Sequence, residues 1–380
     1  MGFVSRTPIY LDHNATTPVH PWVRDEMLPW LGDRWGNASS THAYGRSAAD
    51  ALALARQRIA ALVGALPDEI VFTSGGTEAD NLAILGTRTA RSRIVTSIVE
   101  HPAVEAAVRM RASAGHEHAV MPVDREGRVD LERAAAVLDQ PAGLVSIMLA
   151  QNETGVIQPV AEVAGRARAV ASDVVVHCDA AQAVGKIAVD VAQLGVDLLT
   201  IVGHKFYAPA GIGALVVRTG VAIDPRMHGG GQERGLRSGT EPVALAVALG
   251  AACELAARDL AEEGARQRGL RELLFARLRA GIPEIVRTGA SVETLPNTLH
   301  VRIPGITGAA VLAATPEVAA ATGSACHSEH DAPSGVLAAM GVPAREAMGA
   351  LRLSLGRGTT GADVERAATA LVDGWRRARA

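Results

Sequence analysis

The sequence predicts an α/β protein whose larger domain is built on a mostly parallel sheet. Between about residues 60 and 220, short runs rich in β-branched residues alternate with stretches rich in Ala, Arg and Glu. This alternation is typical of a parallel sheet with helices on both faces. The strand-like runs are almost continuously apolar, as expected for strands buried on both sides. A chain of 380 residues is too long for one ordinary core, so a second, smaller α+β domain is also expected.

The expected elements follow one another along the chain. Strands are predicted at 69–72, 94–99, 144–149, 174–177, 198–202 and 214–217, and helices at 78–85, 104–114 and 160–171. Beyond residue 220, a glycine-rich loop at 228–240 precedes a long helix at 243–279, an extended segment at 297–303 and a final helix from about residue 361. We expect residues 15–250 to form the large domain and residues 1–14 with 251–380 to form the small one.

The composition argues against several classes of function. The formal net charge is −3 and the pI is about 6.5, so charge gives no reason to expect nucleic acid or a membrane as the main partner. No run approaches the roughly 18 apolar residues of a membrane span, and the N-terminus lacks the apolar core of a signal peptide. Three cysteines form no disulfide framework, and Cys178 and Cys253 are expected to be core thiols. A cytoplasmic protein is therefore expected.

Polar or titratable residues follow five of the six predicted strands. They occupy positions 74–77, 100–101, 151–153, 179 and 203–205. In open α/β sheets, ligands bind at the carboxyl ends of the strands. The sequence therefore predicts a functional site at this edge of the sheet.

Two of these strand ends suit particular chemical groups. In SGGTEADN (74–81), two glycines lie between a strand and a helix, where backbone N–H groups and the helix dipole favour a phosphate. A pair of glycines before a helix is also common in simple tight turns, so this interpretation stays open. Asp179 follows an apolar strand and needs a cationic partner, such as a pyridinium nitrogen, a core arginine or a helix N-terminus.

Lysine is rare in this chain. Of 37 lysines and arginines, only Lys186 and Lys205 are lysines. A lysine retained among arginines suggests a function that arginine cannot perform, such as that of an amine nucleophile, although chance explains Lys186 equally well. Lys205 lies 26 residues after Asp179, about one βαβ unit, and should emerge at the same sheet edge. Phosphate site, carboxylate and lysine are three of the groups that pyridoxal phosphate requires.

The stretch TGSACHSEH (322–330) leaves three interpretations of Cys326. It could be a packed thiol, a metal ligand beside His327 and His330, or a nucleophile. Structural zinc takes four ligands with loop spacing between ligand pairs, so adjacent Cys and His fit poorly. Loop-forming residues on both sides favour a nucleophile on a mobile loop.

Nine stretches in order resemble the pyridoxal-phosphate-dependent cysteine desulfurases of the class V aminotransferase group, over essentially the whole chain. They are YLDHNATTP (10–18), FTSGGTEADNLAI (72–84), EHPAV (100–104), NETG (152–155), DAAQAVGK (179–186), GHKFYAPAGIGAL (203–215), GGGQERGLRSGT (229–240), GSAC (323–326) and LRLSLGR (351–357). The resemblance implies the fold type I of pyridoxal-phosphate enzymes, with a large domain of mostly parallel sheet and a smaller α+β domain.

The resemblance also implies a function for each matching position, and no metal site. Lys205 would bind the cofactor covalently, and Cys326 would accept sulfur. The other implied residues are Gly76, Thr77 and His204 at the phosphate, Asp179 at the ring nitrogen, Gln182 at the ring hydroxyl, His101 stacked on the ring, Asn152 beside ring and substrate, and Arg352 at the substrate carboxylate. Thr240 would reach the phosphate of the neighbouring subunit, which implies a homodimer.

The implied reaction converts L-cysteine to L-alanine. Lys205 would take the Cα proton, and the Cys326 thiolate, with His101 as a candidate base, would attack the substrate sulfur. The resulting persulfide would pass its sulfur to an acceptor protein for iron–sulfur cluster or thio-modification biosynthesis.

One position departs from the pattern and keeps an alternative open. Val202 stands where many of these enzymes have a serine, so a hydroxyl is missing from the phosphate site. Together with ACHSEH, the TIVGHKFY form resembles the selenocysteine-lyase-like branch, which would release selenide and L-alanine. A dinucleotide-dependent dehydrogenase is less favoured because SGGTE lacks the G-x-G-x-x-G spacing, and a plain aminotransferase would have no need of Cys326.

Overall fold

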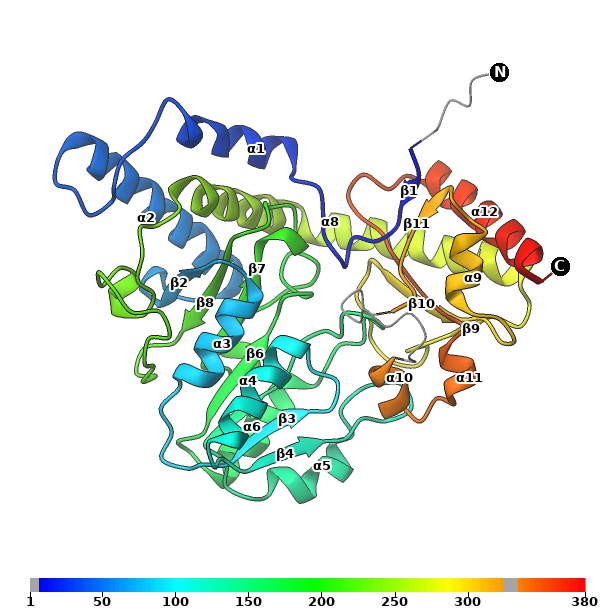
Figure 1. Cartoon of the computed structure of the whole chain (residues 1–380), viewed down its shortest axis with the longest axis horizontal. Helices are drawn as coiled ribbons and strands as arrows, with labels where there is room; N and C mark the ends of the chain where they lie inside the picture. Colours follow the sequence, from blue (N-terminus) through cyan, green and yellow to red (C-terminus); the bar gives the residue numbers. More distant parts are fainter. Residues whose placement is uncertain (1–6, 324–333, 380) are drawn as a thin grey trace.

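The computed structural model describes residues 7–323 and 334–379. It has a larger part around a seven-stranded sheet and a smaller part around a three-stranded sheet. Helix α8 (Val243–Gly281) extends across both parts in Figure 1. The N-terminal strand β1 (Ile9–Tyr10) lies in the smaller part, near the C-terminal helix α12 (Gly361–Arg379).

The seven-stranded sheet is mostly parallel, as predicted. Across it the strand order is β2 (Ile70–Thr73), β8 (Gly213–Val217), β7 (Leu198–Val202), β6 (Val175–Asp179), β5 (Leu144–Ser146), β3 (Ile94–Ser97) and β4 (His118–Met121). Only β8 runs opposite to its two neighbours. Strand β4 was missed by sequence pattern because this edge strand is partly exposed and has no continuous apolar run.

Helices cover both faces of this sheet. On one face, α3 (Gly76–Gly86) and α4 (Pro102–Ser113) pack on residues such as Ile94 and Leu144. On the other, α2 (Ala43–Val63), α5 (Leu131–Leu138) and α6 (Val160–Val170) pack in the main core with Val95 and Val145. Adjacent strand residues thus enter different cores, which follows from the period of two along a strand.

The smaller part has its own hydrophobic core. Strands β9 (Val286–Arg287), β10 (Thr298–Arg302) and β12 (Ala350–Ser354) form an antiparallel sheet, and β1 pairs in parallel with β11 (Val318–Ala319). Helix α12 and the second half of α8 pack in this core with the sheet. The remaining helices are α1 (Pro21–Met27), α7 (Val191–Leu194), α9 (Gly308–Ala313), α10 (Gly335–Ala339) and α11 (Ala344–Ala347).

Helix α8 connects the two cores without a break. Leu249 and Leu255 pack in the larger core, whereas Leu274 and Leu278 pack in the smaller one. The domain limits predicted at residues 14, 250 and 251 stay a prediction. Within the described ranges, no helix combines the length and the hydropathy that a membrane crossing requires.

Candidate active site

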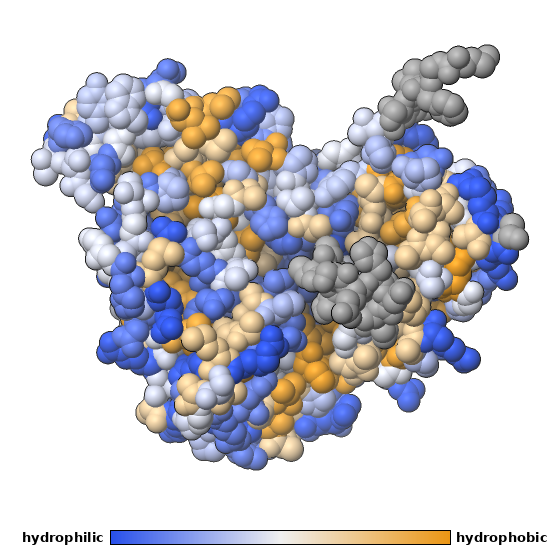
Figure 2. Space-filling view, viewed as in Figure 1, coloured by the Kyte–Doolittle hydropathy of each residue, from blue (hydrophilic) through white to orange (hydrophobic). Residues whose placement is uncertain are grey.

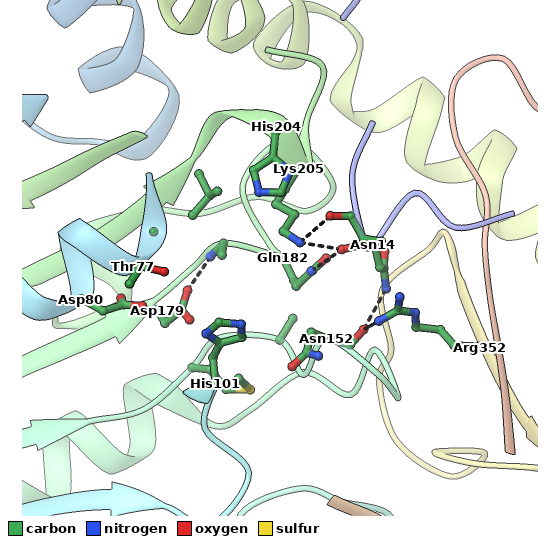
Figure 3. Close-up of a pocket in the computed structure, with 16 residues that line it drawn as sticks. Asn14, Thr77, Asp80, His101, Asn152, Asp179, Gln182, His204, Lys205 and Arg352 are labelled. Carbon is green, nitrogen blue, oxygen red and sulfur yellow. Dashed lines mark hydrogen bonds between the residues drawn. The ribbon is translucent and has the colours of Figure 1, made fainter. Parts of the chain in front are cut away.

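A cavity of about 300 Å³ lies at the predicted sheet edge, where the larger and the smaller parts meet. Nine of the predicted site residues line it: Gly76, Thr77, His101, Asn152, Asp179, Gln182, His204, Lys205 and Arg352. Figure 3 shows these side chains converging from strand ends and loops of the larger part, with Arg352 reaching in from β12. The structure therefore brings together residues as far apart as positions 76 and 352.

The N-terminus of helix α3 forms one end of the cavity. Gly75 has a φ of 150°, in the region that favours glycine, and α3 begins at the next residue. A Cβ atom on Gly76 would lie 2.7 Å from Cγ2 of Val202. The valine that replaces the expected serine therefore packs against the glycine backbone. Exposed N–H groups at this helix start, together with the Thr77 side chain, suit a phosphate group.

His204 lies at the same end of the cavity. Its Nδ1 is 3.1 Å from the Thr16 hydroxyl. Burial and the nearby Lys205 and Lys186 lower the pKa of His204 to about 4. The imidazole is consequently neutral at physiological pH, and it can contact an anion as a hydrogen-bond donor.

Asp179 ends strand β6 and is 6% exposed. Its Oδ1 accepts a hydrogen bond of 2.9 Å from the backbone N–H of Ala181. Burial raises the pKa of Asp179, while the charges of His101 and Lys205 act in the opposite direction. The site therefore favours a cationic group that would compensate a buried carboxylate.

Two further buried acids lie near Asp179, and neither was predicted as a site residue. Asp80 on α3 lines the cavity and is 2% exposed, and burial raises its pKa well above the usual value. Glu100, next to His101, accepts hydrogen bonds from the Ser97 hydroxyl and from the Met148 N–H at 3.0 Å. Burial raises the pKa of Glu100 to about 8. Glu100 directly follows the apolar run Ile98–Val99, which could have indicated a buried acid, whereas Asp80 lies between Glu78 and Asn81 and has no such signal.

Lys205 follows strand β7 in a short 3₁₀ turn. Its Nζ donates hydrogen bonds of 2.8 Å to the backbone carbonyls of Asn14 and Ala15 (Figure 3). The amine is thus held against the N-terminal segment, about 190 residues earlier in the chain.

Asn14 is a further cavity residue that was not predicted from the sequence. It is 1% exposed, and its Nδ2 donates to the Thr298 hydroxyl at 2.9 Å and to the Asn152 carbonyl at 3.3 Å. Its backbone carbonyl also accepts a 2.9 Å hydrogen bond from Gln182 Nε2. Asn14 belongs to YLDHNATTP, one of the matching stretches, which was the only available signal.

His101 and Asn152 lie on the side of the cavity opposite Lys205 in Figure 3. His101 caps helix α4, where its Nδ1 accepts a 3.2 Å hydrogen bond from the Ala103 N–H. The Asn152 carbonyl accepts hydrogen bonds from Asn14 and Arg352.

Arg352 supplies a cationic group at the far end of the cavity. It is 2% exposed; Nη2 forms an ion pair of 2.7 Å with Asp12, and Nη1 donates to the Asn152 carbonyl at 3.1 Å. Among the described residues, Nε has no hydrogen-bond partner. The guanidinium therefore retains donor capacity for an anionic ligand.

Among the described residues, one predicted site residue, Thr240, does not line this cavity. Thr240 is exposed and lies in a separate pocket with Arg237 and Ser74. Cys326 lies outside the described residues, as do His327 and His330, so the metal-ligand interpretation is untested. Within residues 7–323 and 334–379, no group of three His, Cys, Asp or Glu could hold a metal ion. Cys178 and Cys253 are buried, as predicted.

The flanks of the segment 324–333 can still be placed. Ser334 donates a hydrogen bond of 2.6 Å to Oε2 of Glu153, and a Cβ atom on Gly323 would lie 3.1 Å from the same oxygen. Glu153 is buried and follows Asn152 of the cavity. Both flanks of the segment with Cys326 therefore lie beside the cavity wall.

The fold and this set of groups define a class V aminotransferase: that family's model matches residues 9–367. A cysteine desulfurase from Gluconacetobacter diazotrophicus is 45% identical over 365 residues, covering 94% of this chain and 91% of the relative. Among solved structures, a NifS-like protein aligns with a TM-score of 0.90 and 34% identity, covering 98% of this chain and all of that one. The structure of SspA in complex with cysteine aligns with a TM-score of 0.80 and 33% identity, over 91% and 98% of the two chains.

The chain belongs to the cysteine desulfurase family. The family and the fold predicted from the motifs are confirmed. The individual functions that the resemblance implied for the site residues stay predictions.

Proposed function

We propose that this protein is a pyridoxal-phosphate-dependent cysteine desulfurase that converts L-cysteine to L-alanine and transfers the sulfur to Cys326. The observation that carries the proposal is the convergence of Lys205, Asp179 and the start of helix α3 in one cavity, with Arg352 facing them. The SspA structure, which is similar to this chain, contains cysteine, and this supports cysteine as the substrate.

The residues present fit pyridoxal phosphate. A buried carboxyl, Asp179, whose pKa burial raises, gains a compensating charge from a protonated ring nitrogen. Gly76 and Thr77 at the helix start, with neutral His204, would hold the phosphate, and Gln182 and His101 would contact the ring. When bound, pyridoxal phosphate supplies the electron-withdrawing ring that makes the substrate Cα–H acidic.

The chain's own residues would then bind the substrate and move its protons. Arg352 would bind the substrate carboxylate through a bidentate fork, beside Asn152. Lys205 would take the proton from Cα. The Cys326 thiolate would attack the substrate sulfur, so that an S–S bond forms at Cys326 while the C–S bond breaks and alanine is the product. The placement of Gly323 and Ser334 beside Glu153 supports an approach of Cys326 from this side.

We further propose that the protein is a cytoplasmic homodimer and that a separate protein receives the sulfur for iron–sulfur cluster or thio-modification biosynthesis. Thr240 is exposed and does not line its own chain's cavity, as expected if it completes the phosphate site of a partner subunit. Figure 2 shows hydrophobic residues at the surface over α1. The large exposed apolar residues of that end include Leu28, Leu31, Trp35 and Tyr44, which a second copy of the chain would cover.

The experiment that tests the reaction measures alanine release with cysteine and with selenocysteine, for the wild type and for Cys326→Ala. We expect Cys326→Ala to lose turnover on cysteine, because no other residue is proposed to accept the sulfur. Retention of some turnover on selenocysteine is compatible with this mechanism, since a C–Se bond is weaker. Unchanged turnover on cysteine would contradict sulfur transfer to Cys326, and turnover of selenocysteine alone by the wild type would favour a selenocysteine lyase.

The cofactor is tested by the absorbance of the purified protein. We expect a visible band in the wild type and its loss in Lys205→Ala, because that change removes the amine that binds the cofactor. Arg109→Met is the control, since it removes an exposed cationic side chain of helix α4 and leaves Lys205 in place. A colourless wild type, purified with added pyridoxal phosphate, would contradict the proposal.

A further inference from the structure

Lys186, the only lysine of the chain besides Lys205, lies buried directly behind the active-site cavity. It is 9% exposed, and its Nζ donates hydrogen bonds of 2.6 Å to Gln182 Oε1 and 3.1 Å to Asn14 Oδ1. Within the described part of the chain, no carboxylate forms an ion pair with it, and the charged groups that act on it are Lys205 and Arg352. A buried amine with two carbonyl-type partners and no counter-ion requires an explanation.

The choice of lysine at this position has a physical reason. Burial, followed by the charges of Lys205 and Arg352, lowers the pKa of Lys186 well below its usual value. A lysine can release its proton and still donate two hydrogen bonds, whereas the guanidinium of arginine stays charged and would need a buried counter-ion. This explains why lysine is retained here in a chain that otherwise uses arginine.

The two acceptors of Lys186 belong to the network that holds the cavity wall. Lys186 Nζ donates a hydrogen bond to Oε1 of Gln182, and Nε2 of the same amide donates one of 2.9 Å to the Asn14 carbonyl. That carbonyl also accepts the hydrogen bond from Lys205. Gln182 lines the cavity, and Figure 3 shows its amide beside Asn14 and Lys205. The Gln182 oxygen faces Lys186 and one N–H of the amide faces the Asn14 carbonyl, so the second N–H is the donor left for a ligand.

We propose that Lys186 is a positioning residue that fixes the orientation of the Gln182 amide, so that a ligand in the cavity meets an N–H donor and not a carbonyl oxygen. The proposal rests on the proposed function, since the ligand concerned is the ring hydroxyl of pyridoxal phosphate. A donor at this position favours the ionised form of that hydroxyl. Without Lys186 the amide oxygen loses its donor, and only the bond from Nε2 to the Asn14 carbonyl opposes a half-turn that would present the oxygen and disfavour the ionised form.

The experiment is a pH titration of the visible absorbance of the cofactor-loaded protein. Lys186→Met removes the donor and keeps the apolar stem. We expect its titration midpoint to move up by about one pH unit, the size expected for the loss of one hydrogen bond to a charged group. Lys186→Gln, which keeps an N–H donor, should lie closer to the wild type, and it provides the measurement if Lys186→Met does not fold.

A double-mutant cycle separates positioning from a general structural effect. Gln182→Leu should itself raise the midpoint, and adding Lys186→Met to Gln182→Leu should then change nothing further, because the amide that Lys186 orients is gone. A midpoint unchanged in Lys186→Met, or a shift that persists in full in the Gln182→Leu background, would overturn the proposal. A wild type with no visible band would instead contradict the proposed function on which it rests.

Discussion

At the scale of single residues, much of the site could be predicted from the residues that directly follow each strand. Asp179 and Lys205 follow apolar strands, and both line the cavity because parallel strands end at a common edge. Arg352 was placed only by the resemblance, since it lies inside a buried strand, where composition gives no reason to expect a substrate contact. Asn14 was not predicted, because a single asparagine in an irregular segment has no pattern of its own.

Arg352 should bind the substrate by the geometry of its guanidinium as well as by its charge. An Arg352→Lys variant would keep the charge but lose the planar fork and the contact with the Asn152 carbonyl. We expect the KM for cysteine to rise by about tenfold or more, with a smaller change in kcat. Steady-state kinetics measures this, with Arg302→Lys on the neighbouring strand β10 as the control. An unchanged KM in Arg352→Lys would show that another residue binds the carboxylate.

Glu100 should make the stability of the protein depend on pH. Its pKa is raised to about 8, mainly by burial, from an ordinary value of 4.5. The unfolded chain therefore releases this proton at lower pH than the folded one. The stabilisation that Glu100 contributes is complete below about pH 4.5 and is lost as the pH rises towards 8. Its effect on the free energy of unfolding reaches about 1.4 kcal/mol per pH unit in that window.

The variant Glu100→Gln should remove this pH dependence, because a neutral amide replaces the carboxyl group. Urea unfolding of the cofactor-free protein at several values between pH 5 and 8 measures the difference from the wild type. Glu162→Gln is a suitable control, since the Glu162 side chain is 54% exposed. Parallel pH profiles for Glu100→Gln and the wild type would be the contrary result.

At the scale of elements, periodicity predicted helices α3, α4, α6, α8 and α12 and every strand of the larger sheet except β4, but not the core in which each of them packs. The long helix expected at 243–279 is α8, and its composition did not indicate that its two halves lie in different cores. Strand β8 is as apolar as its neighbours, so its reversed direction could not be predicted from its residues. Direction depends on the connection between strands, and the loop from β7 to β8 is short enough for an antiparallel pair.

Two glycines of helix α8 should respond in opposite ways to the same substitution. A Cβ atom on Gly250 would lie 2.8 Å from Cα of Ala55 on α2, whereas nothing lies within 4 Å of one on Gly269. Gly269→Ala should raise the free energy of unfolding by about 0.5–1 kcal/mol through helix propensity. Gly250→Ala should lower it by about 1–3 kcal/mol because the two helices are forced apart. Thermal or urea unfolding checks both, and stabilisation by Gly250→Ala would refute the close contact.

At the scale of the whole molecule, the cavity combines segments from both ends of the chain. Residues 12–15 and Arg352 join strand ends of the larger part, and the hydrogen bonds between Asn14, Thr298 and Asn152 link the two parts. Thr240 is absent from this assembly. If it acts in a partner subunit, the complete site exists only in the dimer.

A mixing experiment tests the shared site. Lys205→Ala should inactivate the site to which its own chain contributes the amine, and Thr240→Asp should place a negative charge against the phosphate of the partner's site. In a mixed dimer both changes fall in the same site, so the second site is intact. Random exchange of the two variants should restore about one quarter of the wild-type activity. No recovery on mixing, or a native mass equal to the single-chain 39.3 kDa, would contradict the arrangement.

The α/β class, the sheet edge that carries the site and, through the motifs, the family all follow from the amino-acid sequence. These depend on local features: the period of apolar residues, the glycines before α3 and the residues that follow each strand. The tertiary structure alone decided which distant groups meet. Lys186 contacts Asn14 across 172 positions, and Arg352 contacts Asp12 across 340. Such contacts depend on how the two cores pack against each other, which no pattern within a single segment encodes.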